Sequence, residues 1–137
     1  MAVVIDNSVF MAWCMSEEDD PKVYNAMQRV ADEGGVVPRI WWYELRHVLL
    51  VYERRGRISQ QQVSDTLADS QELNISIDDE HDDALVLELA RRFNLTVYGS
   101  AYLEVALRRS MPLATLDKRL QEAAENIGVV IVHQVRK

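Results

Sequence analysis

The sequence predicts an α/β fold with three layers, in which helices cover both faces of a mostly parallel sheet of four to five strands. Short runs of β-branched and other apolar residues alternate with longer segments of helical periodicity. Val3, Val4 and Ile5 are apolar without alternation, which is typical of a strand covered on both faces. The expected strands are 3–5, 36–37, 75–77, 113–115 and 129–132. A length of 137 residues fits one domain that spans 1–137.

Turn and cap residues give the boundaries of the first helices. A short apolar helix is expected at 8–15, followed by an acidic loop at 16–20. Pro21 suits the first turn of a second helix, and Gly34 and Gly35 end it.

The segment 39–55 predicts a helix that is apolar on two sides. One apolar arc contains Trp41, Trp42, Leu45, Val48, Leu49 and Tyr52, and the opposite side contains Ile40, Tyr43, Leu50 and Val51. In a small domain this pattern favours core on one side and a partner chain on the other. Glu44 falls among apolar positions, where a carboxylate is seldom unpaired, so either a salt bridge or a metal ion is expected to compensate it.

The second half of the chain continues the alternation. Ser59 and Gln62 have the spacing of a capping box, which opens a helix to about residue 72. The acidic run 78–83 is interpreted as the solvated start of a helix that continues to about Phe93, because acids are favoured in a first helical turn. Two further helices are expected at 100–109 and 118–126.

Composition limits the classes of function. The formal net charge is −7, which counts against nucleic-acid binding unless acids gather in a metal site. No apolar run is long enough to cross a membrane, and the first strand begins too early to leave room for a signal peptide. Cys14 is the single cysteine, so no internal disulfide is available. These features predict a cytoplasmic protein.

Three acids from distant parts of the sequence are expected to converge. Asp6 and Asp117 each follow a buried strand and precede a helix, and the carboxyl ends of parallel strands meet at one edge of a sheet. Glu44, early in the helix after the second strand, can reach the same edge. Two carboxylates about 4 Å apart repel by roughly 4 kcal/mol at an effective dielectric constant of ~20. Such a cluster needs a cation, and oxygen ligands suit Mg²⁺ or Mn²⁺.

The sequence resembles the PIN-domain ribonucleases of the VapC toxin type. The resemblance covers nearly the whole chain, and no single piece of it is specific without the others. Its pieces are Val4-Ile5-Asp6-Asn7-Ser8, Trp42-Tyr43-Glu44-Leu45 and the stretch from Tyr98 to Leu120, which includes Pro112-Leu113-Ala114-Thr115-Leu116-Asp117.

The resemblance implies a metal-dependent endoribonuclease that forms a homodimer and is neutralised by a cognate VapB-type antitoxin. It implies that Asp6, Glu44 and Asp117 are catalytic residues and ligands of Mg²⁺ or Mn²⁺, and that Ser8 and Thr115 support the carboxylates or metal-bound water. The substrate would be RNA, whose phosphodiester is hydrolysed. Arg54, Arg55 and Arg57 are candidates for holding RNA phosphates, although such residues are more often solvated.

One position departs from the family pattern. Gly99 stands where the family usually has the fourth acid of the site. Glu104 is a poor replacement, because five residues along a helix it points about 140° away from position 99. Weakened metal binding and lowered activity are therefore expected. The alternative function is a catalytically weak or inactive PIN-fold module that binds RNA or antitoxin without efficient cleavage.

Overall fold

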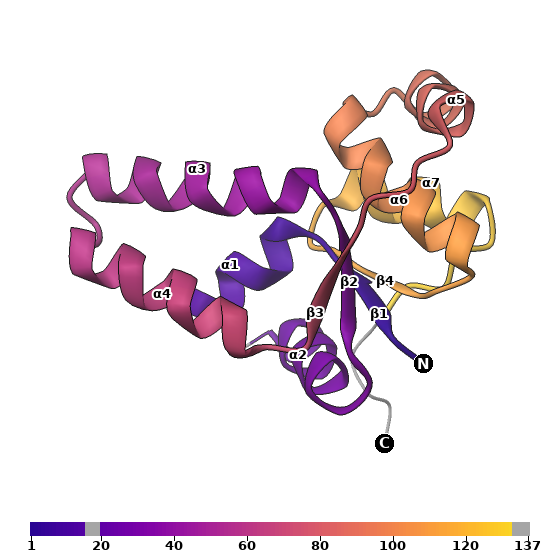
Figure 1. The fold of residues 1–137 in the computed structure, drawn as a ribbon. Helices are drawn as coiled ribbons and strands as arrows, with labels where there is room; N and C mark the ends of the chain where they lie inside the picture. The colour runs from indigo at the N-terminus through magenta and orange to yellow at the C-terminus, as the bar shows by residue number, and fades with distance from the viewer. Residues whose placement is uncertain (16–19, 133–137) are drawn as a thin grey trace.

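Four parallel strands form the centre of the computed structural model, which describes residues 1–15 and 20–132 (Figure 1). The strand order is β3-β2-β1-β4, and all three pairings are parallel. The strands are β1 (Val3–Ile5), β2 (Gly35–Pro38), β3 (Ile75–Asp78) and β4 (Leu113–Ala114). The three residues of β1 are fully buried, which confirms the prediction of a first strand covered on both faces.

Helices cover both faces of this sheet, as the three-layer prediction requires. In Figure 1, α1, α3 and α4 lie on one side of the strands, and α5, α6 and α7 lie on the other. The helices are α1 (Asn7–Met15), α2 (Pro21–Glu33), α3 (Ile40–Arg54), α4 (Gln60–Glu72), α5 (Asp83–Phe93), α6 (Val97–Arg109) and α7 (Lys118–Asn126).

The predicted caps are present. Pro21 begins α2 after Asp20, whose side chain accepts the Lys22 N–H. Ser59 and Gln62 form the complete capping box at the start of α4. Residues 16–19, which belong to the predicted acidic loop, lie outside the described residues.

Two predicted boundaries shift. The segment 129–132 does not extend the sheet as a full strand: within the described residues, its pairing is a single parallel bridge between Leu113 and Ile131. The sheet therefore has four strands. Helix α6 begins at Val97, three residues before the predicted start, because the Thr96 side chain caps it by accepting the Gly99 N–H.

The interpretation of 78–83 as a solvated helix start is right for the end of the run and wrong for its beginning. Asp82 caps α5 and Asp83 lies in its first turn, and both are exposed. Asp78 instead ends β3 and is 8% exposed, and its carboxylate accepts hydrogen bonds from Arg108 at 3.0 and 3.2 Å and from Arg109 at 3.1 Å. Asp79 forms a two-bond ion pair with Arg39.

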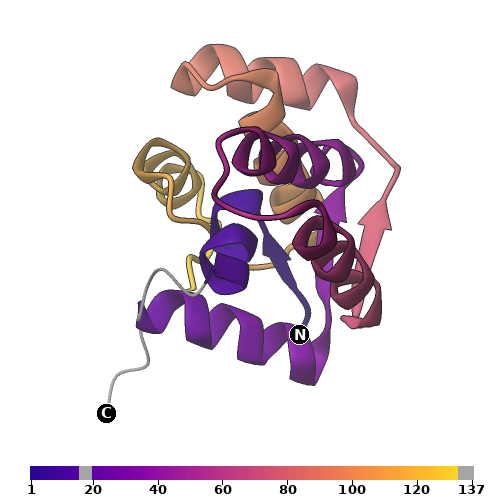
Figure 2. The same cartoon turned by 90° about the vertical axis from the view of Figure 1, so that its left-hand side faces the viewer.

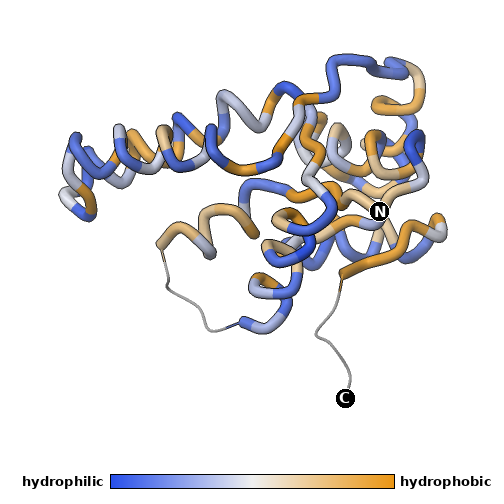
Figure 3. The backbone as a smooth tube through the Cα atoms, turned by 60° about the horizontal axis from the view of Figure 1, so that its bottom comes forward, coloured by the Kyte–Doolittle hydropathy of each residue, from blue (hydrophilic) through white to orange (hydrophobic). Residues whose placement is uncertain are grey.

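Helices α3 and α4 form an arm that projects away from the sheet (Figure 1). Figure 2, turned by 90°, views this arm nearly along its length. No residue of α4 is buried, and Figure 3 shows hydrophilic residues interspersed with hydrophobic ones along the arm. On α3, Trp41, Leu45 and Leu49 are buried, while Leu50 on the other side is 38% exposed. One of the two apolar sides of α3 is therefore left uncovered in the single chain. No helix in the described part of the chain is long and apolar enough to span a membrane.

Candidate active site

Asp6 lies at the carboxyl end of the central strand and is held on both of its carboxylate oxygens. Oδ1 accepts hydrogen bonds from the Ser8 hydroxyl at 2.6 Å and from the Val9 N–H at 3.2 Å. Oδ2 accepts a hydrogen bond from the Thr115 hydroxyl. The side chain is 6% exposed. The two hydroxyl residues suggested by the sequence thus lie directly against the first acid.

The same hydroxyls connect β1 to the segment after β4. Ser8 Oγ also accepts the Leu116 N–H at 3.0 Å, and Thr115 Oγ1 accepts the Asp117 N–H at 3.0 Å. Both hydroxyls donate to Asp6 and accept an N–H from the segment after β4, so Ser8 crosses between the strands by accepting and Thr115 crosses by donating. These bonds fix the backbone of Asp117 beside Asp6, as expected for two adjacent parallel strands.

The carboxylate of Asp117 caps α7. Its Oδ1 accepts the N–H groups of Arg119 at 2.9 Å and Leu120 at 3.3 Å. The residue is exposed, so its other oxygen can face solvent or a bound ion. Capping and ligation use different lone pairs of one carboxylate.

Glu44 comes from the second turn of α3 and meets a tyrosine that the sequence reasoning missed. The Tyr102 hydroxyl donates a hydrogen bond of 2.5 Å to Glu44 Oε1. Tyr102 is 2% exposed; burial raises the pKa of its hydroxyl far above the usual value, and the Glu44 carboxylate raises it further. The phenol is therefore a permanent donor. The sequence signal that could have identified Tyr102 is its position one helical turn after Gly99, on the same face of α6.

Burial and mutual repulsion raise the pKa values of two of the acids. Burial raises the pKa of Asp6, the bonds from Ser8 and Thr115 oppose this, and Asp117 adds to the increase. Burial also raises the pKa of Glu44; Tyr102 lowers it, and Asp6 raises it again. The charged neighbours that shift these two groups are thus themselves carboxylates. Nearby negative charges of this kind favour binding of a cation.

The donor atoms suit a hard divalent ion, although the side chains are not gathered around one point. Oxygen ligands of this type are those that Mg²⁺ and Mn²⁺ prefer. Within residues 1–15 and 20–132, no group of three or more acidic, histidine or cysteine side chains is arranged to hold a metal ion.

Comparison with known proteins gives the family. The model of the PIN domain matches residues 3–126. The chain belongs to the PIN-domain family. No curated protein matches it significantly in sequence.

Solved structures share the fold of this PIN domain at low sequence identity. The protein PAE2754 from Pyrobaculum aerophilum is 18% identical, with a TM-score of 0.69 over 96% of this chain and 90% of that chain. A toxin-antitoxin complex from Klebsiella pneumoniae is 16% identical, with a TM-score of 0.66 over 97% and 99%. FitAcB from Neisseria gonorrhoeae is 16% identical, with a TM-score of 0.65 over 96% and 97%.

Gly99 lies in the first turn of α6 of the PIN domain. A Cβ atom built there would meet Thr96 Oγ1 at 3.4 Å, which is ordinary van der Waals contact. An aspartate is therefore sterically acceptable at this position. Glu104 lies away from the three acids: it is fully buried, and it accepts hydrogen bonds from Arg108 at 2.6 Å and from the Asp82 N–H at 3.3 Å.

The candidate phosphate-binding arginines lie at the tip of the arm. Arg54 ends α3, ten residues after Glu44, which corresponds to about 15 Å along a helix axis. The Arg57 guanidinium lies over the Tyr52 ring at 4.5 Å from its centroid. These residues are therefore separated from the acids by several helical turns, and a role in RNA binding would concern nucleotides distant from the cleaved bond.

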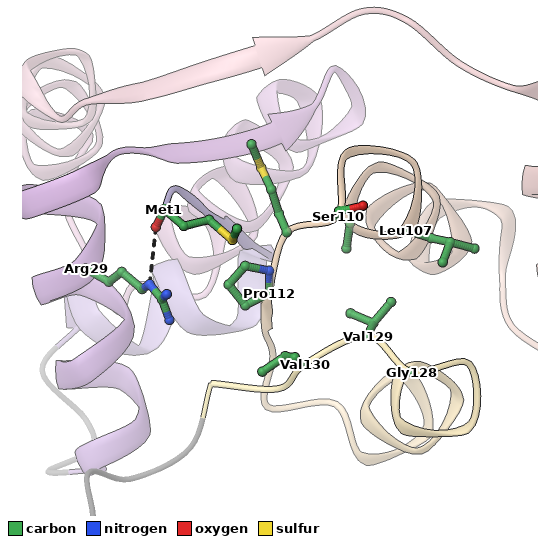
Figure 4. A pocket seen from close by; sticks show the side chains of 10 residues that line it. Met1, Arg29, Leu107, Ser110, Pro112, Gly128, Val129 and Val130 are labelled. Carbon is green, nitrogen blue, oxygen red and sulfur yellow. Dashed lines mark hydrogen bonds between the residues drawn. The ribbon is translucent and has the colours of Figure 1, made fainter.

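Two pockets differ in their relation to the acids. A pocket of about 380 Å³ includes Glu44 and lies between α1, α3 and α6; its lining residues are Asn7, Ile40, Tyr43, Glu44, His47, Val48 and Tyr98. A second pocket, of about 350 Å³, lies where Met1 and Pro112 precede β1 and β4, at the opposite end of these strands (Figure 4). There the Arg29 side chain donates a hydrogen bond of 3.3 Å to the Met1 carbonyl. None of the described residues that line this second pocket is acidic, so the pocket lacks the chemistry of the first.

Proposed function

We propose that this PIN domain is a metal-dependent endoribonuclease toxin of a VapBC-type toxin–antitoxin module. The observation that carries the proposal is the position of Asp6, buried at the carboxyl end of the central strand, with Asp117 and Glu44 as charged neighbours. Membership of the PIN family and the fold shared with toxin-antitoxin proteins support it. Such an enzyme acts where RNA is present, so we propose a cytoplasmic location.

In the proposed reaction the chain hydrolyses an RNA phosphodiester. Asp6, Glu44 and Asp117 would hold Mg²⁺ or Mn²⁺, which, when bound, activates water and stabilises the leaving oxygen. Ser8 and Thr115 fix the orientation of Asp6 by donating to its two oxygens. Tyr102 does the same for Glu44. The proposed partners are RNA, a VapB-type antitoxin and a second copy of the chain.

A specific observation also supports a second candidate function. Position 99 lacks a carboxylate in a helix turn that leads to Tyr102 and the site. With one acid fewer, the chain could bind RNA or antitoxin without efficient cleavage. The two functions differ in whether pure protein cuts RNA in a metal-dependent way.

Restoring the acid tests both candidates. Gly99→Asp should raise Mg²⁺- or Mn²⁺-dependent RNA cleavage and tighten metal binding, because it adds an oxygen ligand and negative charge. It should also lower the stability of the metal-free protein at neutral pH by no more than about 4 kcal/mol, through repulsion between carboxylates. RNA cleavage against metal concentration and thermal melts with and without chelator measure these effects.

Gly99→Asn is the matched control, because it adds similar volume without charge. If Gly99→Asp changes neither cleavage nor metal binding relative to Gly99→Asn, position 99 is not part of the site. If neither the original chain nor Gly99→Asp cuts RNA with metal present, the nuclease proposal is wrong and the binding module is favoured.

A further inference from the structure

We propose that the pocket between α1, α3 and α6 binds one nucleobase of single-stranded RNA, stacked against Tyr43 and Tyr98, beside the bond that is cut. This subsite rests on the proposed function, because it shares Glu44 with the acids. It would determine which nucleotide is accepted next to the cleaved phosphodiester.

Two exposed tyrosines from different helices give the pocket its aromatic surface. Tyr43 lies in the first turn of α3 and Tyr98 in the first turn of α6, and each is 58% exposed. The Tyr43 ring packs edge-on against Trp42, with 4.9 Å between ring centroids and 70° between the planes, so one edge of the ring is supported and its face is left open. Flat aromatic surfaces open to solvent are the groups on which single-stranded bases stack.

A polar group without a partner also lines the pocket. The Oδ1 atom of Asn7 is buried and has no hydrogen-bond partner among the described residues. A buried acceptor of this kind is costly to leave unpaired, and a rotation of the amide toward the pocket would let an exocyclic amine of a base satisfy it. His47 adds a second polar side chain to the lining. Apolar walls with a few polar groups are typical of pockets that bind small planar ligands, and about 380 Å³ lies within their usual size range.

The connection to the acids identifies the occupant as part of a nucleic acid. Glu44 lines the pocket, and Asn7 directly follows Asp6. A phosphate at the acids would therefore leave the base of the same or the adjacent nucleotide within reach of the pocket. A peptide could also fill an apolar space and donate to an amide, but the shared Glu44 and the neighbouring Asp6 favour a nucleotide whose phosphate lies at the proposed metal site.

Binding of RNA to an inactive form of the whole chain tests the proposal. Asp117→Asn is a suitable background because asparagine is also a good helix cap. The probe is a fluorescent single-stranded RNA of a few nucleotides with Mg²⁺ present, recovered intact after the measurement. Tyr43→Ala and Tyr98→Ala should each weaken binding by about five- to 100-fold, whereas Tyr98→Phe should retain it. Tyr24→Ala, which removes a tyrosine 68% exposed on α2, is the matched control and should have no effect.

An RNA that lacks one base completes the test. Removing the base should weaken binding to the starting protein, and should cause a smaller loss in Tyr98→Ala, where the base keeps only its contact with Tyr43. Equal binding by Tyr98→Ala and Tyr24→Ala would overturn the proposal. The proposal would also be overturned if Tyr98→Ala were monomeric in sedimentation while its RNA binding was unchanged, because the pocket would then be a contact between protein chains.

The two proposals fail in different ways. If the chain cuts RNA but the tyrosine variants bind it normally, the nuclease function stands and the base subsite is wrong. If the tyrosines contribute to RNA binding but no metal-dependent cleavage occurs, the subsite stands in a binding module.

Discussion

The hydroxyl of Tyr102 gives Glu44 a fixed orientation in an otherwise apolar surrounding. Its hydrogen bond of 2.5 Å is made inside the protein, where the tyrosine is 2% exposed. Tyr102 touches an acid of the site without being placed to contact a substrate, so we regard it as a positioning residue.

Tyr102→Phe should therefore change the titration of Glu44. The hydrogen bond from Tyr102 lowers the pKa of Glu44 against the effect of burial, so its loss should raise that pKa further. Because the protonated form binds metal poorly, affinity for Mg²⁺ at neutral pH should fall, and stability should decrease by about 1–2 kcal/mol. Carboxyl NMR titration of Glu44 and metal-binding calorimetry measure these changes.

Tyr24→Phe is the matched control for this variant, since Tyr24 is exposed on α2. A purely structural role for Tyr102 would lower the melting temperature without moving the Glu44 pKa. That outcome would contradict the positioning role.

The buried ion-pair cluster between β3 and α6 operates at the scale of elements. Arg108 donates to Asp78, to Glu104 and to the Glu80 carbonyl, the last at 2.6 Å. These bonds hold the carboxyl end of the edge strand against the helix that also carries Gly99 and Tyr102. The cluster thus fixes where α6 lies relative to the acidic edge of the sheet.

Asp78→Asn should destabilise the protein by about 2–3 kcal/mol at pH 7, because charge-assisted hydrogen bonds to Arg108 and Arg109 are lost. Burial raises the pKa of Asp78, but the bonds and charge of Arg108 outweigh it and hold the pKa below its usual value. A carboxyl group whose pKa is lowered by folding stabilises the protein at pH values above its unfolded-state pKa of about 3.9. This stabilisation is lost as the pH falls through the folded-state pKa. The stability difference between the two proteins, measured by urea unfolding, should therefore close below about pH 4.

Asp79→Asn is the control for this series, since Asp79 forms an exposed pair with Arg39. Such pairs contribute little, so Asp79→Asn should cost less than about 1 kcal/mol. Equal losses for both variants would mean that the cluster has no special structural role.

The same cluster shows what the sequence can and cannot predict. The strands and most helix ends follow from local signals: apolar runs, Pro21, the Ser59 capping box. The beginning of the acidic run was misinterpreted because Arg108, the partner of Asp78, lies 30 residues away in the sequence. Aspartate and glutamate occur both at helix starts and in buried ion pairs. Only the tertiary contacts distinguish the two cases.

The candidate site divides in a similar way. Asp6 and Asp117 could be expected together because parallel strand ends share an edge. The partnership of Tyr102 with Glu44 depends on how α3 and α6 pack, 58 residues apart, and no local pattern encodes it. Only the family resemblance indicates that Gly99 occupies the position of an acid. From composition and periodicity alone, Gly99 would be interpreted as an ordinary glycine at the start of a helix.

For the whole molecule, the raised pKa values of Asp6 and Glu44 couple folding to pH and metal. A carboxyl group whose pKa is higher in the folded than in the unfolded protein stabilises the fold at pH values below its unfolded-state pKa. This contribution is lost as the pH rises through the folded-state pKa. The metal-free protein should therefore be less stable at pH 7 than at about pH 5, and Mg²⁺ should recover stability at pH 7, by about 2.7 kcal/mol at 100 times its dissociation constant.

Thermal melts at both pH values, with Mg²⁺ or chelator, test this coupling. The comparison lies above the pH range in which Asp78 titrates. Glu44→Gln is the matched variant, because it keeps the shape of the side chain without its charge, and it should show a smaller effect of both pH and Mg²⁺. Identical Mg²⁺ responses in the two proteins would exclude Glu44 as a ligand.

The uncovered side of α3 predicts a homodimer in solution. Leu50 is 38% exposed on the side of α3 opposite the buried Trp41, Leu45 and Leu49, and a second copy would cover this side. Sedimentation should show a dimer at micromolar concentration and a monomer for Leu50→Glu. Val130→Glu, at an exposed position outside α3, should remain dimeric. A monomeric starting protein would contradict the prediction.

The arm also has a consequence for how the family can diversify. Its tip turns at Gly56, where φ is +72° and no atom of the described residues lies within 4 Å of an added Cβ. The turn is thus constrained by its own backbone and not by neighbouring elements. Helical turns can be inserted or deleted there during evolution while the strand ends keep Asp6 and Asp117 in place and the beginning of α3 keeps Glu44 in place. The length of the arm can therefore change to suit the size of a binding partner without altering the acids at the sheet.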